Sequence, residues 1–509
     1  MPIANEAALL SLQRRFCKLN HCQFLQKDKL LKTYLDIQKD NTNPRWDILN
    51  TLQMKNVRSQ SGIAVVSVLT KPFPCPGECL YCPNEQGVPK SYLSGEPAVM
   101  RAQACHFHPY AQVFTRLKAL KDTGHIIDKV SIRIIGGTWS SYPAMYQNWF
   151  IRQLYKAASE FDGERLKDND LKSLQLINEK AKSRIVELSV ETRQDMIKYD
   201  DLLRYRKYGI TKVELGVQSL NDHVLTLNRR GHKVAATAKA TKLLKDFGFK
   251  VSYQMMLNLY GSDYQTDLAV FKNLFENSTY KPDHLKIYPL AVIKDSEMAK
   301  IAQKSKHHIY GKTELIGLIA DIKKLIPEYC RVERVIRDIP SDRIVSGGAM
   351  TSNLRQEVAK ELEKRGYKCK CIRCREVKKI KSLEKVELKI LSYKASGVKE
   401  YFISFEDSIQ DKLVGFCRLR LNKKTSNKTL DHAAIIREIH VYGSTVAIGD
   451  TNPEAFQHQG WGKKLISEVE SIAGKNGYHK IAVIAGVGVR GYFRKLGYDL
   501  NQSYMTKNI

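Results

Sequence analysis

The segment KPFPCPGECLYCPNE, residues 71–85, contains three cysteines and is the strongest indication of the fold of this chain. Cys75, Cys79 and Cys82 form a C-x3-C-x2-C pattern on a loop with prolines and a glycine, directly after the β-rich run VVSVLT. Three thiolates this close can bind three irons of a [4Fe-4S] cluster. Zinc is the alternative, but it needs a fourth ligand that this loop does not supply. The open fourth iron would bind S-adenosylmethionine, whose reductive cleavage yields a 5′-deoxyadenosyl radical.

The residues around this loop, from 58 to 345, alternate between short β-rich runs and longer helical ones such as AQVFTRLKALKD. Repeated strand–helix units predict a parallel sheet with helices outside, and six repeats predict a partial (β/α)6-type barrel with its chemistry at the carboxyl ends of the strands. The predicted strands are GIAVVSVLT (62–70), KVSIRIIGG (129–137), RIVELSVET (184–192), KVELGVQS (212–219), KVSYQMMLNL (250–259) and HLKIYPL (284–290).

Glycines and polar residues follow three of these strands and are predicted to bind the cofactor. Two glycines in a row would let the backbone approach the amino group of S-adenosylmethionine closely. Each short motif alone is also typical of an ordinary strand-to-helix turn, but their order behind the cysteine triplet favours a cofactor site. The predicted residues are Gly136, Gly137, Thr138, Glu191, Thr192, Arg193, Gln218 and Ser219.

Residues 383–509 change to hairpin-like strands, a glycine turn, a helix, a strand and a second helix, which predicts a separate α+β domain. A Q-x-x-G-x-G pattern, QHQGWG at 457–462, stands between the strand IREIHVYG and the helix KKLISEVESIA. Successive N–H groups at such a helix start bind a pyrophosphate, so we expect a GNAT-like domain that binds acetyl-coenzyme A. The predicted contacts are Glu438, Ile439, His440 and Val441 with the pantetheine arm, Gln459, Gly460, Trp461 and Gly462 in the turn, and Tyr492 and Phe493 near the thiol.

A basic connector, residues 346–382, joins the two predicted domains and carries a second cysteine triplet. Cys369, Cys371 and Cys374 form a C-x-C-x2-C pattern, and three thiolates this close favour a structural zinc that locks the domains together. The predicted fourth ligand is His432, with Cys330 as the other candidate. Three unbound thiols are the alternative, but they would be prone to oxidation.

The chain is strongly basic, with 83 Lys and Arg against 53 Asp and Glu and a formal net charge of +30. This excess favours binding to nucleic acid through a basic channel that leads to the cluster, although a genome that often encodes lysine could also produce it. Residues 1–57 are predicted to form either a basic arm that contacts RNA or a helical cap on the next domain. The arm candidates are Arg14, Arg15, Lys27 and Lys29, whereas Arg229 and Arg230 are interpreted as a solvated surface run.

Length, hydropathy and cysteine usage restrict the class of protein. A chain of 509 residues predicts about two to four domains. The N-terminal segment has no basic region before an apolar core, and the uncharged stretch 481–489 is too short to span a bilayer, so we expect neither secretion nor a membrane. Eleven cysteines without an export signal predict metal sites in a reducing compartment, the cytoplasm.

Taken together, the motifs resemble the Elongator protein 3 family, the catalytic subunits of Elongator, over residues 58–509. The resemblance implies that acetyl-coenzyme A supplies carbon and that the deoxyadenosyl radical abstracts hydrogen from its methyl group. The acetyl radical would add to C5 of the wobble uridine of tRNA, and hydrolysis of the thioester would leave 5-carboxymethyluridine. The matching motifs are the first cysteine triplet, GGT (136–138), VETRQD (190–195), ELGVQS (214–219), NRRGH (228–232), LKIYP (285–289), RVIRDIP (334–340), REIHVYG (437–443), FQHQGWG (456–462) and GVGVRGYFRKLGY (486–498).

The resemblance also implies roles for single residues. Lys129 would contact acetyl-coenzyme A in the radical site, and Lys463 and Lys464 would join the coenzyme A contacts of the glycine turn. Transfer RNA would be the partner, with either accessory subunits or self-association in addition.

The chain departs from the family pattern at three places. Three residues separate the first two cysteines, as in prokaryotic members. Leu257 and Tyr260 replace two prolines of the family pattern, and RCREV (373–377) replaces RTREV. Three alternatives remain: a protein lysine acetyltransferase, a non-catalytic scaffold that binds tRNA, and a radical methylthiolase of tRNA. The intact first triplet argues against the first alternative, the coenzyme A turn against the second, and the acetyl-coenzyme A domain against the third.

Overall fold

The computed structural model describes residues 6–37, 48, 51–54, 62–167, 170–294, 296–305, 307–347, 353–378, 382–422, 425–443 and 460–509. Its largest domain is built on a parallel sheet whose neighbouring strands are hydrogen-bonded in the order β1-β2-β3-β4-β5-β6-β8. The strands are β1 (Ala64–Leu69), β2 (Lys129–Ile135), β3 (Arg184–Thr192), β4 (Lys212–Gln218), β5 (Lys250–Leu257), β6 (His284–Pro289) and β8 (Arg331–Arg334). The predicted partial barrel is confirmed, and β8 extends it beyond the six strands expected.

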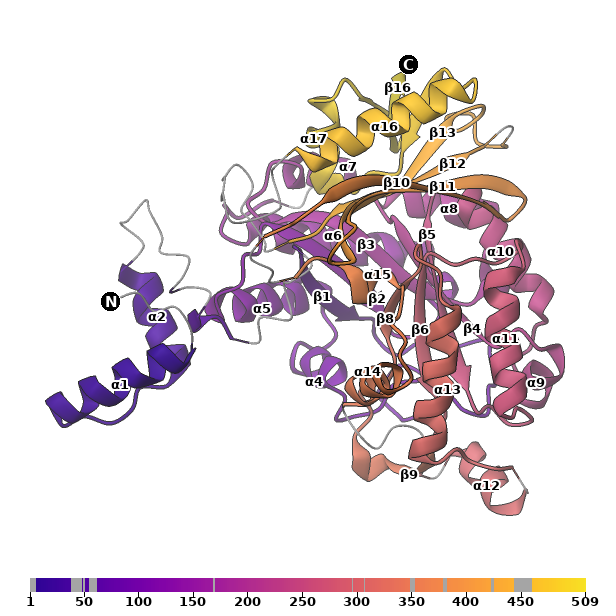
Figure 1. Ribbon diagram of the computed structural model, residues 1–509, viewed down its shortest axis with the longest axis horizontal. Helices are drawn as coiled ribbons and strands as arrows, with labels where there is room; N and C mark the ends of the chain where they lie inside the picture. The colour runs from indigo at the N-terminus through magenta and orange to yellow at the C-terminus, as the bar shows by residue number, and fades with distance from the viewer. Residues whose placement is uncertain are drawn as a thin grey trace.

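Helices cover the outer face of the parallel sheet, as Figure 1 shows for α9, α10, α11 and α13. Pro97 and Pro109 stand in the first turn of their helices, where the fixed φ of proline suits the helix start. The helices of this domain are α4 (Pro97–Ala104), α5 (Pro109–Asp122), α6 (Ala144–Glu160), α7 (Leu171–Asn178), α8 (Tyr199–Lys207), α9 (Asp222–Leu227), α10 (Val234–Asp246), α11 (Tyr264–Glu276), α12 (Glu297–Lys304) and α13 (Lys312–Leu325). A small antiparallel pair, β7 (Ala291–Ile293) and β9 (Ile344–Gly347), lies outside the main sheet.

The second domain is a mixed sheet in the order β10-β11-β12-β13-β14-β16-β15. Its strands are β10 (Val386–Ala395), β11 (Val398–Asp407), β12 (Lys412–Leu421), β13 (Ala434–Val441), β14 (Lys480–Val483), β15 (Asp499–Asn501) and β16 (Tyr504–Asn508). Its described residues include the helices α16 (Trp461–Lys475) and α17 (Arg490–Arg494). Strands β13 and β14 are parallel and pair only over Ala434–Ile436, so they diverge beyond that point. The predicted α+β domain is therefore present.

A β-bulge decides where the side chains of β13 point. Arg418 pairs with Glu438 and Leu419 pairs with Ile436, so Arg437 is an extra residue on β13. Because a bulge shifts the alternation of a strand, Arg437 and Glu438 both face the parallel sheet. After the bulge, Ile439 packs against the core of the mixed sheet instead.

The mixed sheet covers the amino-terminal ends of the barrel strands. Glu438 lies against Lys250 and His284, the first residues of β5 and β6. The η6 turn (Val487–Val489) packs on β3 so closely that a Cβ on Gly486 would overlap the backbone of Val186. Since one apolar core contains residues of both sheets, among them Val213 and Ile435, the two domains form one packed unit.

The first described residues form an arm outside this unit. Helices α1 (Glu6–Asn20) and α2 (Lys27–Ile37) project from the body at the N-terminal side in Figure 1. Leu9 and Leu31 are buried in a small apolar cluster, which attaches the arm beside Gly124. Arg14, Arg15 and Lys29 are exposed on it and Lys27 is half-buried. No helix among the described ranges combines the length and apolar character needed to cross a membrane.

Candidate functional site

The first cysteine triplet opens into a cavity of about 540 Å³ inside the parallel sheet. The loop follows the carboxyl end of β1, and its cysteines meet residues from the same ends of β2, β3 and β4 because parallel strands end at one edge. The predicted residues that line this cavity are Cys75, Cys79, Cys82, Gly137, Thr138, Glu191, Thr192, Arg193 and Gln218. Ser219 and Gly136 are next to it in the chain but not on its wall; Gly136 has a φ of 126°, and a Cβ there would overlap Thr70.

Two arginines lie beside the sulfur atom of Cys79. Arg230 Nη1 lies 3.3 Å from Cys79 Sγ, and Arg193 Nη1 lies 3.9 Å from it. A hydrogen bond from the Cys82 thiol, together with the charge of Arg230, lowers the pKa of Cys79 to about 4 although burial opposes the shift. Thiolates are the form of cysteine that binds metals, so the loop fits a [4Fe-4S] cluster.

Arg230 is a residue whose role the sequence interpretation missed. Arg229 is exposed and pairs with Glu297 at 2.6 Å, as expected of a solvated run, but Arg230 is only 5% exposed and bonds Cys79 and the carbonyl of Gly216. Arg229 has a φ of 50°, so the chain reverses there after α9 and turns the next side chain inward. In the sequence, the glycine and histidine that follow the two arginines in NRRGH (228–232) could have indicated that Arg230 is not part of an ordinary solvated run.

Charged side chains continue from this cavity toward the mixed sheet. Glu191 accepts hydrogen bonds from Tyr92 Oη at 2.8 Å and Gln254 Nε2 at 3.0 Å. Lys286 lies between Glu191 and Glu214, and further in, Lys212 pairs with Glu214 at 3.2 Å and Glu333 at 2.6 Å. Apart from Glu191, the sequence interpretation did not include these residues. Charges two positions apart in otherwise apolar strands, as in KVE and HLK, could have indicated them, because such residues share one face of a strand.

A second cavity, of about 810 Å³, opens where β13 and β14 diverge. The turn before α16 forms part of its wall, and Gly460 has a φ of 82°, which favours glycine. The predicted residues that line it are Lys129, Glu438, Ile439, His440, Val441, Gly460, Trp461, Gly462, Lys463, Tyr492 and Phe493. Lys464 is not on this wall; its Nζ stacks over the Trp461 ring, 4.5 Å from the centroid. Gln459 lies outside the described residues.

The position of Lys129 differs from the prediction. We expected it in the radical site, but it is the first residue of β2 and lines the second cavity. The physical reason is the direction of the strand, because the amino-terminal strand ends face the mixed sheet and the cysteine loop lies at the opposite ends. Burial lowers the pKa of the Lys129 ammonium group.

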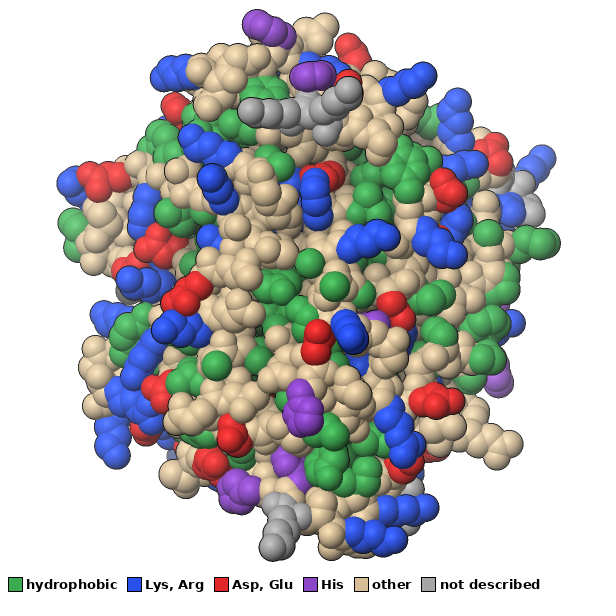
Figure 2. Space-filling model, turned by 90° about the vertical axis from the view of Figure 1, so that its right-hand side faces the viewer, with side chains coloured by type: hydrophobic (Ala, Val, Ile, Leu, Met, Phe, Trp, Pro, Cys, Tyr) green, Lys and Arg blue, Asp and Glu red, His purple; other side chains and the backbone are tan. Residues whose placement is uncertain are grey.

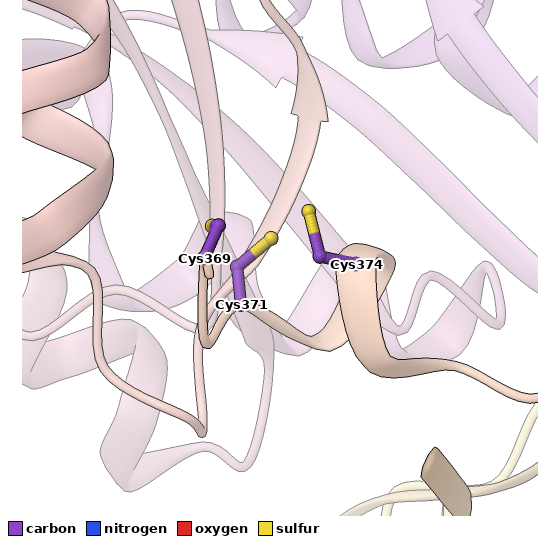
Figure 3. A group of neighbouring side chains, drawn as sticks. All are labelled: Cys369, Cys371 and Cys374. Carbon is purple, nitrogen blue, oxygen red and sulfur yellow. The ribbon is translucent and has the colours of Figure 1, made fainter. Parts of the chain in front are cut away.

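The second cysteine triplet forms a compact group. The sulfur atoms of Cys369, Cys371 and Cys374 all lie within 4.8 Å of one another, at the start of α15 (Ile372–Arg375) and after α14 (Leu354–Lys364). Figure 3 shows these three side chains side by side, from the loop and the first turn of α15. Three close thiols fit the donor set that zinc prefers.

The predicted fourth ligand, His432, is wrong. The cysteine connector lies at the start of β12, where Val377 N donates a hydrogen bond to Leu413 O at 3.0 Å. His432 is exposed and lies near the other end of β12, where Leu421 pairs with Ala434. That length of strand spans about 25 Å. Cys330 accepts a backbone hydrogen bond from Ile372 N at 3.1 Å, but its sulfur is not part of the group found among the described residues.

Basic side chains line the first cavity together with carboxylates. Figure 2 shows Lys and Arg side chains spread over one face of the molecule, with Asp and Glu between them. The wall of the first cavity, in contrast, includes Lys90, Arg101, Arg334, Arg337 and Arg373. The basic channel for nucleic acid that the sequence led us to expect stays a prediction.

Comparisons with known proteins match both domains. The radical SAM superfamily matches residues 74–269, its C-terminal domain 282–364, and the acetyltransferase (GNAT) family 373–498. A tRNA uridine(34) acetyltransferase of Dehalococcoides mccartyi is 41% identical over 89% of this chain and 99% of its own. Elongator complex protein 3 of Saccharomyces cerevisiae is 38% identical, over 91% of this chain and 86% of its own.

A solved structure agrees with these sequence relatives. Methanocaldococcus infernus Elp3 with residues 1–46 deleted has a TM-score of 0.78 and 37% identity, and the match covers 88% of this chain and all of that chain. The chain therefore belongs to the Elongator protein 3 family, with a radical S-adenosylmethionine domain and a GNAT acetyltransferase domain in one polypeptide.

Proposed function

We propose that this chain is a tRNA-modifying acyltransferase that forms 5-carboxymethyluridine at uridine 34 from acetyl-coenzyme A and S-adenosylmethionine. The observation that carries this proposal is that the two cavities are neighbours with a common wall: Ile63, Glu187, Glu438 and His440 line both. A protein lysine acetyltransferase would need no cysteine-loop cavity beside its coenzyme A cavity. The relatives named tRNA uridine(34) acetyltransferase support the choice of substrate.

Each cavity would hold one reactant. In the first, Cys75, Cys79 and Cys82 would bind a [4Fe-4S] cluster, which together with S-adenosylmethionine supplies the 5′-deoxyadenosyl radical. Gly137 and Arg193 would orient the S-adenosylmethionine beside it. In the second cavity, the divergent part of β13 would receive the pantetheine arm and the turn before α16 the pyrophosphate.

Tyr492 would contact the sulfur of coenzyme A. Its hydroxyl faces the glycine turn, since a Cβ on Gly462 would lie 2.8 Å from Tyr492 Oη. Burial raises the pKa of Tyr492, so the hydroxyl keeps its proton at neutral pH and can donate a hydrogen bond.

Transfer RNA would reach the first cavity along its basic wall, and the exposed arm residues Arg14 and Arg15 would contact phosphates. We place the reaction in the cytoplasm, where both thiol triplets stay reduced. Accessory subunits or self-association would complete the assembly.

As domain limits we propose 1–57 for the arm, 58–345 for the radical domain, 346–382 for the connector and 383–509 for the acetyltransferase domain.

Anaerobic reconstitution tests this function. Protein loaded with iron and sulfide is incubated with a reductant, S-adenosylmethionine, acetyl-coenzyme A and unmodified tRNA, and the digested nucleosides are analysed by mass. We expect 5-carboxymethyluridine at position 34 and 5′-deoxyadenosine in the same reaction. Acetylated lysine peptide without consumption of S-adenosylmethionine would contradict the proposal.

We also propose that Cys369, Cys371 and Cys374 bind a structural zinc, with a fourth ligand other than His432. Cys371 is fully buried and the three sulfurs are already close enough to share one ion. Zinc would tie the connector to both domains, because Ile372 N bonds the radical domain at Cys330 and Val377 N bonds β12 at Leu413.

The expected result of Cys371→Ser is a fall in bound zinc from about one ion per chain to less than one tenth of that, because zinc prefers a complete set of thiolates. Metal content is measured by mass spectrometry on protein purified without added metal. Cys105→Ser, which changes a cysteine outside both triplets, should keep its zinc. Undiminished zinc in the Cys371 variant would exclude this site.

A further inference from the structure

Tyr492 lines the second cavity from the short helix α17, and a residue of the radical domain holds that helix at both ends. Arg490 Nη1 lies 3.2 Å from one carboxylate oxygen of Glu179, and Arg494 Nη1 lies 2.5 Å from the other. Because the two arginines are four residues apart, they share one face of the helix. Tyr492 is midway between them in the chain, so helix geometry places it on the opposite face, where its hydroxyl lies toward the glycine turn.

The ion pair between Glu179 and Arg490 is buried. Both side chains are only 5% exposed, whereas the side chain of Arg494 is 42% exposed. Burial, together with the charge of Arg490, lowers the pKa of Arg206 to about 10, so a second buried cation is close by. Since an uncompensated buried charge is costly, the carboxylate of Glu179 strongly favours the observed place of Arg490 and thus of α17.

Glu179 is itself fixed by its position at the end of α7. Its neighbour Asn178 is fully buried, donates a hydrogen bond from its side chain to Ser183 O at 3.2 Å and accepts one from Ile185 N at 2.9 Å. The segment before α17 packs on the same part of β3, because a Cβ on Gly488 would lie 3.0 Å from Ile185 O. The radical domain therefore holds α17 both by backbone packing and by charge.

We propose that Glu179 is a positioning residue of the coenzyme A site: through Arg490 and Arg494 it holds α17 so that Tyr492 faces the sulfur of coenzyme A. This inference rests on the proposed function, in which Tyr492 makes that contact. The acetyltransferase site is then complete only when its domain is packed on the radical domain, which supplies the carboxylate. Glu179 also lines the second cavity, so the experiment must separate positioning from a direct contact with the ligand.

The test is a double-mutant cycle between Glu179→Gln and Tyr492→Ala. The probe is S-ethyl-coenzyme A, a thioether that cannot be hydrolysed, and its binding to the full chain is measured by calorimetry with unmodified tRNA present. Tyr492→Ala removes a hydrogen bond and the ring contact, so it should weaken binding about tenfold. Glu179→Gln should weaken binding about fivefold in the parent chain but by less than about twofold in the Tyr492→Ala chain, because residues that act through one contact are not additive.

Two further variants separate positioning from folding. Arg494→Gln removes the exposed partner of Glu179 and leaves the buried pair with Arg490 intact, so it should weaken binding only about twofold to threefold. Asp170→Ala removes the side chain that caps the other end of α7, where it accepts a hydrogen bond from Ser173 N, and should leave binding unchanged. Thermal unfolding followed by circular dichroism verifies that each variant is folded at the temperature of the titration.

The inference is overturned if Glu179→Gln binds the thioether like the parent, or if the effects of the two substitutions multiply, which would assign Glu179 a contact of its own. It is also overturned if Asp170→Ala weakens binding as much as Glu179→Gln, since loss of helix stability would then explain both. A parent chain that does not bind the thioether would remove the coenzyme A site and the proposed function with it. If the cycle is non-additive but no 5-carboxymethyluridine forms, the proposed function fails and the positioning role of Glu179 stands.

Discussion

Cys79→Ala is expected to abolish bound iron–sulfur cluster, 5′-deoxyadenosine and 5-carboxymethyluridine together, each by at least about 100-fold. Cys79 is the thiolate held by Arg193 and Arg230, so its loss removes one of three cluster ligands and leaves two buried guanidinium groups facing an alanine. The measurements are iron per chain, visible absorbance of anaerobically reconstituted protein, and both products by mass spectrometry.

Cys22→Ala is the matched control, because Cys22 is an exposed cysteine on the arm. It should retain iron and both products. Carboxymethyluridine that persists in the Cys79 variant would remove the radical mechanism from the proposed function, whereas loss of product with full iron content would assign Cys79 a role other than ligation.

Asp283→Asn is expected to destabilise the fold by about 3–5 kcal/mol, because it breaks a buried ion pair between the two domains. Asp283 is fully buried, and its carboxylate accepts hydrogen bonds from Arg437 Nη1 at 3.0 Å and from Val251 N at 2.8 Å. The variant keeps the shape of the side chain but removes the negative charge that faces the cationic groups of Arg437 and Lys245. Urea unfolding followed by circular dichroism gives the change in free energy.

The pH dependence of stability gives an independent reading of the same residue. Burial alone would raise the pKa of Asp283, but the charges of Arg437 and Lys245 hold that pKa well below its ordinary value. A carboxyl whose pKa is lowered by folding stabilises the protein above its unfolded pKa of about 4, and this contribution is lost as pH falls further. The parent should therefore lose stability below pH ~4, and Asp283→Asn should lose less over the same range.

Asp122→Asn is the surface control. Asp122 pairs with Lys118 at 3.0 Å, but both side chains are more than half exposed, so the expected change is less than about 1 kcal/mol. An equal effect of the two substitutions would show that the buried network does not hold the domains together.

Short sequence patterns were sufficient to predict the local chemistry of this protein. The spacing of Cys75, Cys79 and Cys82, the alternation of strands and helices, and the glycine turn before Trp461 all act over a few residues. Such short-range patterns fix loop geometry, strand faces and helix starts, so they predicted both domains, and most of the predicted cofactor-site residues line one of the two cavities.

How these segments meet depends on three-dimensional packing, which the short patterns do not predict. Strand direction placed Lys129 in the second cavity, the length of β12 separated His432 from the cysteine group, and packing after α9 buried Arg230 against Cys79. The bulge at Arg437 turned His440 toward the radical domain. Each outcome depends on contacts between residues far apart in the chain, which only the packing of the two sheets brings together.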